Sequence, residues 1–411
     1  MTWAIGCGPM SFFLKELEQN NKKPWLLAYL ILLGGLPPLT TDMYLPALPR
    51  MVEQFGASLG LVNLTLVLFF VFFATSILIW GTLSDKYGRK PIIIFCMSLY
   101  IVSSLLCSIA GGVYQLIVFR VMQAIGGGAS VAVSMAIMKD VFEGRERERA
   151  LSFVSIFMVI APITAPTIGA LILKVMSWRG IFMVLAGFGA IALTGALFLN
   201  ETARKDPDKG IFRTLANLLT VLRNPGFAYP LPLFALMSFP VFIFIGSSSD
   251  IYITRFGLSE QIYGLFFGGN AMFSAIGPVI FMVVSRYFRT QKIIAVSFFL
   301  TLISGLCVVL LGSKGPLLFA VSVVPSTLAA SMLRPPSANL LLEQVKKDAG
   351  AASSLMNFSF VFIGSMGMYF ISLGWGNRIL MVGLVYAMVG MINLSLWPLA
   401  WKKCGTALRP S

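Results

Sequence analysis

One acidic side chain stands inside an otherwise apolar part of the sequence. Asp42 occurs in Leu-Pro-Pro-Leu-Thr-Thr-Asp-Met-Tyr-Leu-Pro, about five residues from the outer end of the helix that we expect there. Burial favours the neutral form of a carboxylate, whereas a nearby cation favours its charged form. An acid balanced between these two effects can take up and release a proton. We therefore interpret Asp42 as a proton-coupling residue, and the alternative is an acid that snorkels to the water-facing end of its helix.

One arginine supplies the opposite charge at a similar depth of another apolar run. Arg120 occurs in Phe-Arg-Val-Met-Gln-Ala-Ile-Gly-Gly-Gly, about five or six residues from the outer end of its helix. A guanidinium stays protonated, so in a low dielectric it needs a carboxylate, a carbonyl or water as partner. The equal depth favours Asp42, an acidic solute or water. The alternative is an arginine that bonds backbone carbonyls and holds its helix in register.

A compact cluster of charge and glycine follows the second apolar run. Residues 81–91 read Gly-Thr-Leu-Ser-Asp-Lys-Tyr-Gly-Arg-Lys-Pro, and a helix that ends on such a turn must expose it to water. We expect Arg89 to meet Asp140, and Asp85 to cap the start of another helix, whose first turn carries about half a positive charge. The alternative is a topology signal with a tight turn. The predicted cytoplasmic latch consists of Gly81, Asp85, Gly88, Arg89 and Asp140.

The apolar run over residues 150–174 carries two prolines and a glycine in close succession, Pro162, Pro166 and Gly169. Each proline removes a backbone hydrogen bond, and the glycine permits another helix to approach closely. We expect this helix to bend and to pack tightly. The alternative is ordinary packing of small residues.

Composition places these side chains in a membrane protein. The chain is 57% hydrophobic and 11% charged, whereas a soluble domain carries about 25% charged residues. It contains no histidine, the commonest metal ligand and a frequent general base. We therefore expect neither an enzyme nor a metal site, and no cofactor. The 31 Lys+Arg against 16 Asp+Glu fit basic cytoplasmic loops rather than a nucleic-acid partner.

Twelve apolar runs are long enough for the roughly 20 residues that a membrane crossing needs. Their predicted ranges are 25–47, 60–82, 91–111, 115–138, 150–174, 179–200, 228–250, 261–284, 292–312, 316–340, 350–373 and 378–401. An even number of crossings puts both termini on one side. With that side inside, 23 of the 31 basic residues lie in cytoplasmic segments and 6 in outer loops, so the positive-inside rule predicts cytoplasmic termini.

The longest interior polar stretch separates six crossings from six. We expect an all-α membrane protein of two six-helix bundles, with a solute site between them near the midplane. The predicted segments are a cytoplasmic N-terminal segment 1–24, an N-terminal bundle 25–200, a cytoplasmic linker 201–227, a C-terminal bundle 228–401 and a cytoplasmic tail 402–411. We attach no function to residues 1–9.

Several of these motifs resemble those of a known family. Residues 81–91 resemble the loop between the second and third helices of the major facilitator superfamily of secondary transporters. Arg120-x-x-Gln123-Ala-x-Gly resembles the span-four motif that its proton-coupled members use for transfer, and residues 161–170 resemble a motif of its exporters. The Asp42 segment and Trp178-Arg179-Gly-Ile-Phe are similar to the bicyclomycin and chloramphenicol resistance branch of the drug/proton antiporters.

The resemblance implies the twelve-helix major facilitator fold, in which Asp85 meets the start of the eleventh span at Gly350. It also implies export by alternating access, driven by the proton gradient, from a monomer that spans the bacterial inner membrane several times. Two departures leave the substrate open. Gly34 stands where some relatives place a glutamate, and the second span lacks the glutamine and proline common in that branch.

Polar and aromatic side chains of the central helices are expected to contact the solute. The candidates are Tyr44, Gln123, Phe239, Phe242, Tyr263, Phe266, Asn270, Asn357 and Phe360. With one buried acid and one buried base, such a site suits neutral, zwitterionic or anionic amphiphiles.

We therefore expect a proton-coupled exporter of small amphipathic compounds, with a small-molecule substrate, protons and lipid as its partners. The first alternative is a carrier dedicated to one metabolite, such as a siderophore or a sugar-like solute. The second is a receptor that does not transport, or a membrane enzyme.

Overall fold

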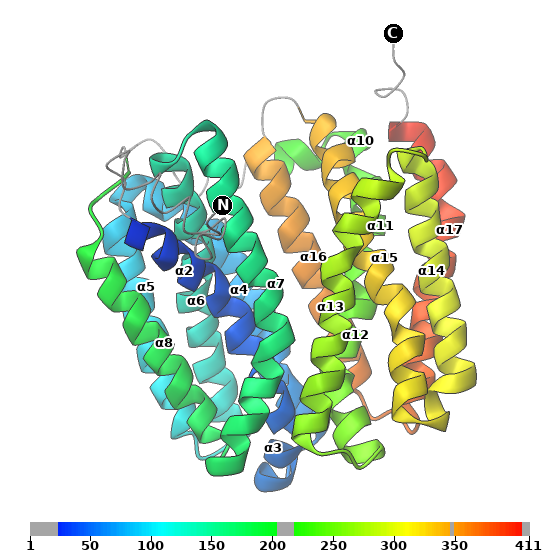
Figure 1. Ribbon diagram of the computed structural model, residues 1–411, viewed down its shortest axis with the longest axis horizontal. Coiled ribbons are helices and arrows are strands. Elements are labelled where there is room, and N and C mark those ends of the chain that lie inside the picture. The colour runs from blue at the N-terminus through cyan, green and yellow to red at the C-terminus, as the bar shows by residue number, and fades with distance from the viewer. Residues whose placement is uncertain (1–23, 204–217, 346–348, 405–411) are drawn as a thin grey trace, which may run out of the picture.

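The computed structural model describes residues 24–203, 218–345 and 349–404 of the 411-residue chain. These ranges fold into helices joined by short turns, and no strand occurs in them (Figure 1). Twelve helical segments are long and apolar enough to cross a membrane. The predicted all-α fold class and its twelve crossings are therefore confirmed. Residues 1–23 of the predicted N-terminal segment, 204–217 of the predicted linker and 405–411 of the predicted tail lie outside the described residues.

The helices fall into two halves along the chain. The N-terminal half consists of α2 (Pro24–Asp42), η1 (Leu45–Ala47), α3 (Leu48–Phe55), α4 (Leu59–Tyr87), α5 (Arg89–Ser108), α6 (Val113–Val141), α7 (Gly144–Val175) and α8 (Arg179–Phe198). The C-terminal half consists of α10 (Pro225–Ala228), α11 (Pro230–Leu236), α12 (Ser238–Ser249), η2 (Asp250–Arg255), α13 (Glu260–Val284), α14 (Thr290–Leu311), η3 (Gly312–Lys314), α15 (Pro316–Glu343), α16 (Ala349–Ser372) and α17 (Arg378–Cys404).

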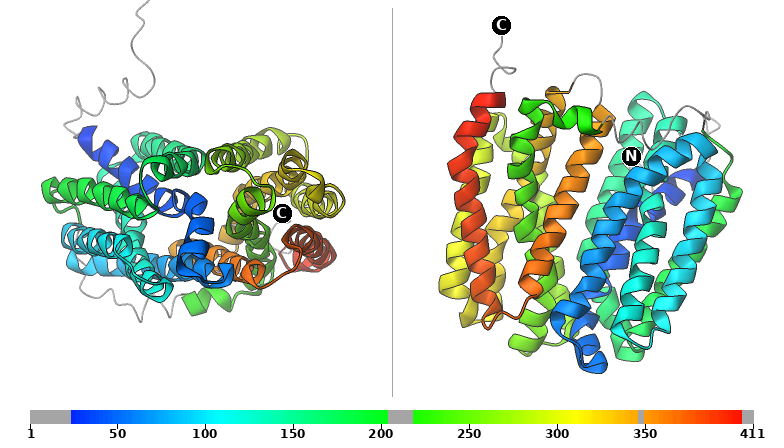
Figure 2. Two further views of the ribbon diagram at one scale, coloured as in Figure 1. Left: turned by 90° about the horizontal axis from the view of Figure 1, so that it is seen from below. Right: turned by 180° about the vertical axis from the view of Figure 1, so that it is seen from behind.

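The two ends of the helical body are distinguished by the connection between the halves. We call the end where α8 finishes and α10 begins the linker end, and the opposite end, where α3 lies, the far end (Figure 1). The halves meet along two pairs of helices. The first pair is α7 and α13, seen in Figure 1, and the second is α4 and α16, seen from behind in Figure 2.

The first crossing is interrupted in its interior. Helix α2 ends at Asp42, a short 3-10 turn follows, and α3 continues the crossing to Phe55. Pro46 and Pro49 each occupy one of the first two positions of the next helical piece, where a missing backbone donor is tolerated. The prolines therefore restart the helix instead of ending it. Asp42 consequently lies farther from the end of its crossing than the sequence indicated.

Glycines allow the backbones of α2, α7 and α13 to approach closely at this interruption. A side chain at Gly169 of α7 would collide with the backbone carbonyl of Met43. On the other side of α7, a Cβ at Gly268 of α13 would lie 2.5 Å from the carbonyl oxygen of Ile163, and one at Gly264 would lie 3.0 Å from the Cα of Thr167. We call this contact of α7 and α13 the glycine seam. Small residues at such positions are what close helix packing in membranes requires.

The start of α5 is held by a carboxylate that follows α8. Glu201 accepts hydrogen bonds from the backbone N–H groups of Arg89 at 2.8 Å and Lys90 at 3.2 Å. These are among the donors that a helix start leaves without a partner inside the helix. Gly88 before them has φ +111°, and a side chain there would collide with the Glu201 carboxylate. The positive φ thus accounts for the predicted glycine of the latch, and a side chain there would also displace the Glu201 carboxylate.

Partial burial alone would raise the pKa of Glu201. The backbone N–H groups of Ala203, Arg89, Lys90 and Thr202 bond the charged form, and they bring its pKa below the ordinary value of a glutamate. The hydrogen bonds therefore outweigh the burial.

A substitution at the glycine that contacts Met43 tests the close packing of α7. Gly169→Ala is expected to destabilise the protein, because the added methyl group meets a backbone oxygen that cannot move aside, and overpacking of this kind costs about 1–3 kcal/mol. Gly187→Ala on α8 is the matched control, since a Cβ there meets nothing within 4 Å. Thermal unfolding in detergent measures both, and equal midpoints for the two variants would contradict this packing.

Removal of the Glu201 charge tests the cap on α5. A group with a lowered pKa stabilises the fold above its unfolded pKa, and this stabilisation is lost as the pH falls through its folded pKa. Glu201→Gln is therefore expected to lower the unfolding midpoint modestly at pH 7, and the difference from the unaltered protein should shrink on acidification. Glu148→Gln, at an exposed position of α7, is the control. A deficit that stays constant with pH would argue against the charged cap.

Candidate functional site

The carboxylate of Asp42 lies in the interface between the halves. Its residue is 7% exposed, and it accepts a hydrogen bond of 2.9 Å from the hydroxyl of Thr41. It lies near Tyr263 of α13, and the 3-10 turn that follows it packs on α7, α12 and α13. An acid at this place is in contact with both halves, so its charge can affect how they pack.

Arg120 lies in a buried aromatic cage within the N-terminal half. Its guanidinium carbon is 4.3 Å from the ring centre of Phe69, 4.8 Å from that of Tyr44 and 5.7 Å from that of Phe182. One terminal nitrogen donates to the carbonyl of Thr40 at 3.3 Å and to Gln123 at 2.7 Å. The other two nitrogens are buried and have no hydrogen-bond partner. Such donors are costly to leave unpaired.

A buried polar network joins this cage to α2 and α5. The amide of Gln123 donates to Ser104 at 2.7 Å, and Ser104 donates to the carbonyl of Tyr100 at 2.6 Å. The hydroxyl of Tyr100 is 2.6 Å from that of Thr40. The network thus returns to the residue whose carbonyl binds Arg120. Side chains of three helices are fixed around one cation.

The structure does not pair Asp42 with Arg120. Arg120 instead binds the carbonyl of Thr40, two residues before Asp42, which is the backbone-carbonyl alternative drawn from the sequence. The similar depths of Asp42 and Arg120 in their helices thus indicated correctly that Arg120 contacts the end of α2. They could not reveal that Asp42 lies near Tyr263, because depth does not determine which neighbouring helix a side chain faces.

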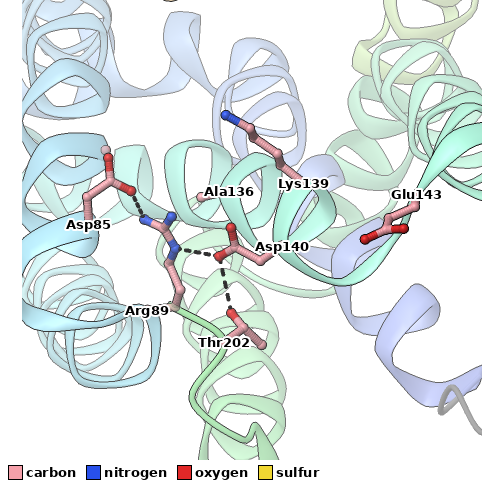
Figure 3. A pocket seen from close by; sticks show the side chains of 8 residues that line it. Asp85, Arg89, Ala136, Lys139, Asp140, Glu143 and Thr202 are labelled. Carbon is pink, nitrogen blue, oxygen red and sulfur yellow. Dashed lines mark hydrogen bonds and ion pairs between the residues drawn. The ribbon is translucent and has the colours of Figure 1, made fainter. Parts of the chain in front are cut away.

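The charged residues of the predicted latch come together at the linker end of the N-terminal half. Arg89 pairs with Asp85 at 2.6 Å and with Asp140 at 3.0 Å (Figure 3). It also donates to the hydroxyl of Ser84 at 2.7 Å. Thr202 donates to the same carboxylate of Asp140 at 3.5 Å. Gly81, Asp85, Arg89 and Asp140 also line a pocket of about 530 Å³. The guanidinium of Arg89 at the start of α5 is thereby bonded to the last turns of α4 and α6.

The expected contact between Arg89 and Asp140 is thus present in the structure. The further expectation that Asp85 caps the helix at Gly350 stays a prediction, because residues 346–348, just before that helix, lie outside the described residues. The role of the latch in closing the two halves also stays a prediction. Pro162 and Pro166 lie within a continuous α7, where they remove two backbone donors.

Two of the nine predicted cavity residues line a cavity of about 190 Å³ among α11, α15 and α16. They are Asn357 and Phe360, and the cavity wall also contains Arg334. The other candidates are not in its lining. These are Tyr44, Gln123, Phe239, Phe242, Tyr263, Phe266 and Asn270. Two of them belong to the surroundings of Arg120, and Tyr263 is fully buried, with its hydroxyl 3.1 Å from that of Ser248.

Polar contacts between the halves gather toward the far end in the described part of the chain. Arg50 pairs with Glu260 at 2.7 Å, and Gln261 donates to the carbonyl of Ala170 at 3.0 Å. The amide of Asn63 donates to the carbonyl of Gly246 at 2.8 Å and to the hydroxyl of Ser372 at 2.7 Å. Together with the glycine seam, these contacts hold the far end closed.

Sequence reasoning missed two residues of this arrangement. Arg334 was visible as a basic residue inside the predicted crossing 316–340, and its isolation from acids along the chain was the available signal. Glu201 follows the sixth crossing directly, but no local pattern indicates that it reaches the start of α5. That contact joins segments more than a hundred positions apart.

Comparison with known proteins gives the family. The family model of the Major Facilitator Superfamily matches residues 30–368. An uncharacterized MFS-type transporter of Bacillus subtilis, YdgK, is 28% identical over 356 residues, which cover 84% of this chain and 88% of that protein.

Two further relatives carry names from drug resistance. A bicyclomycin resistance protein homolog of Haemophilus influenzae is 28% identical over 61% of this chain and 64% of its own length. The multidrug resistance protein MdtL of Klebsiella pneumoniae is 33% identical over 41% of this chain and 43% of its own length. The matched regions thus span less than two thirds of either relative.

Solved structures support the same fold at low sequence identity. A bacterial homolog of the human lysosomal transporter Spinster, in an inward-facing and occupied conformation, has a TM-score of 0.69 and 15% identity over 94% of this chain and 96% of that chain. The nucleoside transporter NupG has a TM-score of 0.73 and 11% identity over 92% of this chain and 100% of that chain.

The predicted family is therefore confirmed by a match that covers most of the sequence and by twelve crossings in the predicted order. This multi-pass membrane protein belongs to the Major Facilitator Superfamily, a family of transporters rather than enzymes.

Proposed function

We propose that this protein exports small amphipathic compounds in exchange for protons. The observation that carries the proposal is the pair of charged groups around the break in the first crossing. Asp42 is buried between the halves with a threonine hydroxyl as its hydrogen-bond partner, and Arg120 nearby has two buried nitrogens without partners. The relatives named for bicyclomycin and multidrug resistance support the class of substrate.

The geometry suggests how proton binding is coupled to the change of conformation. In the conformation described here, Asp42 lies near Tyr263, and Arg120 binds the carbonyl of Thr40 instead of this carboxylate. Loss of its proton to water leaves a carboxylate in a dry interface, which is unfavourable without a cation. Arg120 of the N-terminal half is a cation with two buried nitrogens that lack a hydrogen-bond partner. Moving the carboxylate toward them requires the break at Asp42 to turn, and this shifts the turn that packs on α13.

The membrane potential and the pH gradient supply the energy, with no bound cofactor. One charge that crosses 100 mV is worth about 2.3 kcal/mol. The excess of basic residues in the segments at the linker end supports a cytoplasmic position for that end, by the positive-inside rule. The far end, closed by Arg50 and Glu260, then faces the periplasmic side of a bacterial inner membrane, and the chain works as a monomer.

In this orientation the cluster around Arg89 lies on the cytoplasmic side. It fastens α4, α5 and α6 together through Asp85 and Asp140, so these helices move as one body. We propose that this body meets α16 when the cytoplasmic side closes. The same cluster then latches the halves in the outward-open conformation.

Neutralising the central acid tests the coupling. Proteoliposomes with an inside-acid pH gradient should accumulate bicyclomycin or naphthalene-2-sulfonate while the gradient dissipates. In Asp42→Asn, gradient-driven uptake is expected to fall to the level of protein-free vesicles, because the amide cannot release a proton. Exchange of labelled for unlabelled compound at equal pH should persist, since it needs no proton transfer.

A control substitution removes a different carboxylate from the same crossing. Glu53 is exposed on α3, so Glu53→Gln should transport as the unaltered protein does. Normal uptake in Asp42→Asn, or no uptake of either compound by the unaltered protein, would contradict the proposed antiport.

A further inference from the structure

A second arginine inside the membrane-crossing helices is not used by the proposed proton coupling. Arg334 belongs to α15, one of the twelve crossings. It lies deep among the helices, yet its side chain is exposed. The two facts agree because the cavity of about 190 Å³ opens onto it. A charge in such a place is expensive, and it marks a functional site by default.

The guanidinium of Arg334 lacks an acidic partner among the described residues. Its contact is with an aromatic ring, since the guanidinium carbon lies 4.4 Å from the ring centre of Phe360. Two acids of the C-terminal half that form ion pairs are not in the lining of this cavity. Asp250 pairs with Arg378 at 2.6 Å, and Glu260 pairs with Arg50. The planar donors of Arg334 are therefore available to a group that enters the cavity.

The wall of the cavity contains both polar and apolar side chains. Ser337, Ser353 and Asn357 lie in it with Arg334, and its apolar residues include Phe234, Met237 and Met356. A compound that contacts both kinds of side chain has a charged or polar head and a flat apolar body. Methionine and aromatic side chains adapt to such bodies without a fixed shape.

A row of aromatic rings connects this cavity to the other half of the protein. The ring of Phe360 is 6.2 Å from that of Phe242, which is 4.9 Å from that of Phe70 on α4. A compound bound beside Phe360 therefore contacts a chain of rings that ends in the N-terminal half. Its presence can influence how the halves pack, as a transported compound must.

We propose that Arg334 and Phe360 form a subsite for an anionic aromatic amphiphile, such as a carboxylate or sulfonate on a fused ring. The inference rests on the proposed export function and specifies its substrate class. The anion bonds the guanidinium fork, and its ring lies against Phe360 and the methionines. Charge-assisted bonds of this type are stronger than neutral ones, so a neutral analogue of the same ring should bind at least about tenfold more weakly.

Binding measurements can test this subsite without a proton gradient. Calorimetry on the full-length protein in phosphatidylcholine nanodiscs would use naphthalene-2-sulfonate as the anion, 2-naphthalenemethanol as the neutral analogue and 2-naphthylmethylammonium as the cation. The unaltered protein should prefer the anion. Arg334→Gln should lose that preference while it retains the neutral compound, and Arg334→Lys should restore part of it.

Two control variants and one change of lipid test whether the preference for the anion comes from this subsite. Arg286→Gln removes an exposed arginine after α13 and should leave the preference unchanged, whereas Phe360→Leu should weaken all three aromatic compounds. Phosphatidylglycerol in the nanodiscs should leave anion binding intact. Competition by that lipid would assign the subsite to a lipid headgroup and overturn the proposal.

The same measurements distinguish failure of the subsite from failure of antiport. Equal anion binding by Arg334→Gln and the unaltered protein, or no preference for the anion in the unaltered protein, overturns the subsite whatever the transport result. Anion binding that depends on Arg334 supports the subsite even where Asp42→Asn transports normally, because the assay contains no gradient.

Discussion

The interruption of the first crossing at Asp42 determines how several helices pack. Because α2 stops there, the backbone of Met43 is free to lie against Gly169, and α7 can approach both α2 and α13. The same interruption brings the carboxylate into the interface between the halves and leaves the carbonyl of Thr40 to Arg120. A continuous helix would bond that carbonyl within itself. The positions of the Asp42 carboxylate and the Arg120 guanidinium therefore depend on the interruption of helical hydrogen bonding at the end of α2.

The two arginines inside the membrane crossings have different surroundings. Arg120 is enclosed by three rings, a carbonyl and an amide, and it is fully buried. Arg334 touches one ring and borders a cavity. An enclosed cation is held in one place and suits an internal exchange with Asp42. A cation that borders a cavity suits recognition of something that comes and goes.

Much of the fold could be predicted because apolar length is a strong local signal. The ranges of the twelve crossings, and the pairing of Arg89 with Asp140, followed from hydropathy and from charges placed at helix ends. The proximity of Asp42 to Tyr263, the cavity beside Arg334 and the contact of Glu201 with the start of α5 could not be predicted in this way. They depend on how helices rotate about their axes and on contacts between distant segments. A single sequence reveals neither the rotation of a helix nor such distant contacts. Membrane helices are apolar on most faces, so they lack the polar and apolar periodicity that would indicate which face is buried.

The glycine seam has a mechanical consequence for the far end. Gly264 and Gly268 carry no side chain, so the backbone of α13 lies directly against Ile163 and Thr167 of α7. At these two positions α13 has no side chain of its own to repack when the helices tilt against each other. The seam can therefore act as a pivot between the two halves.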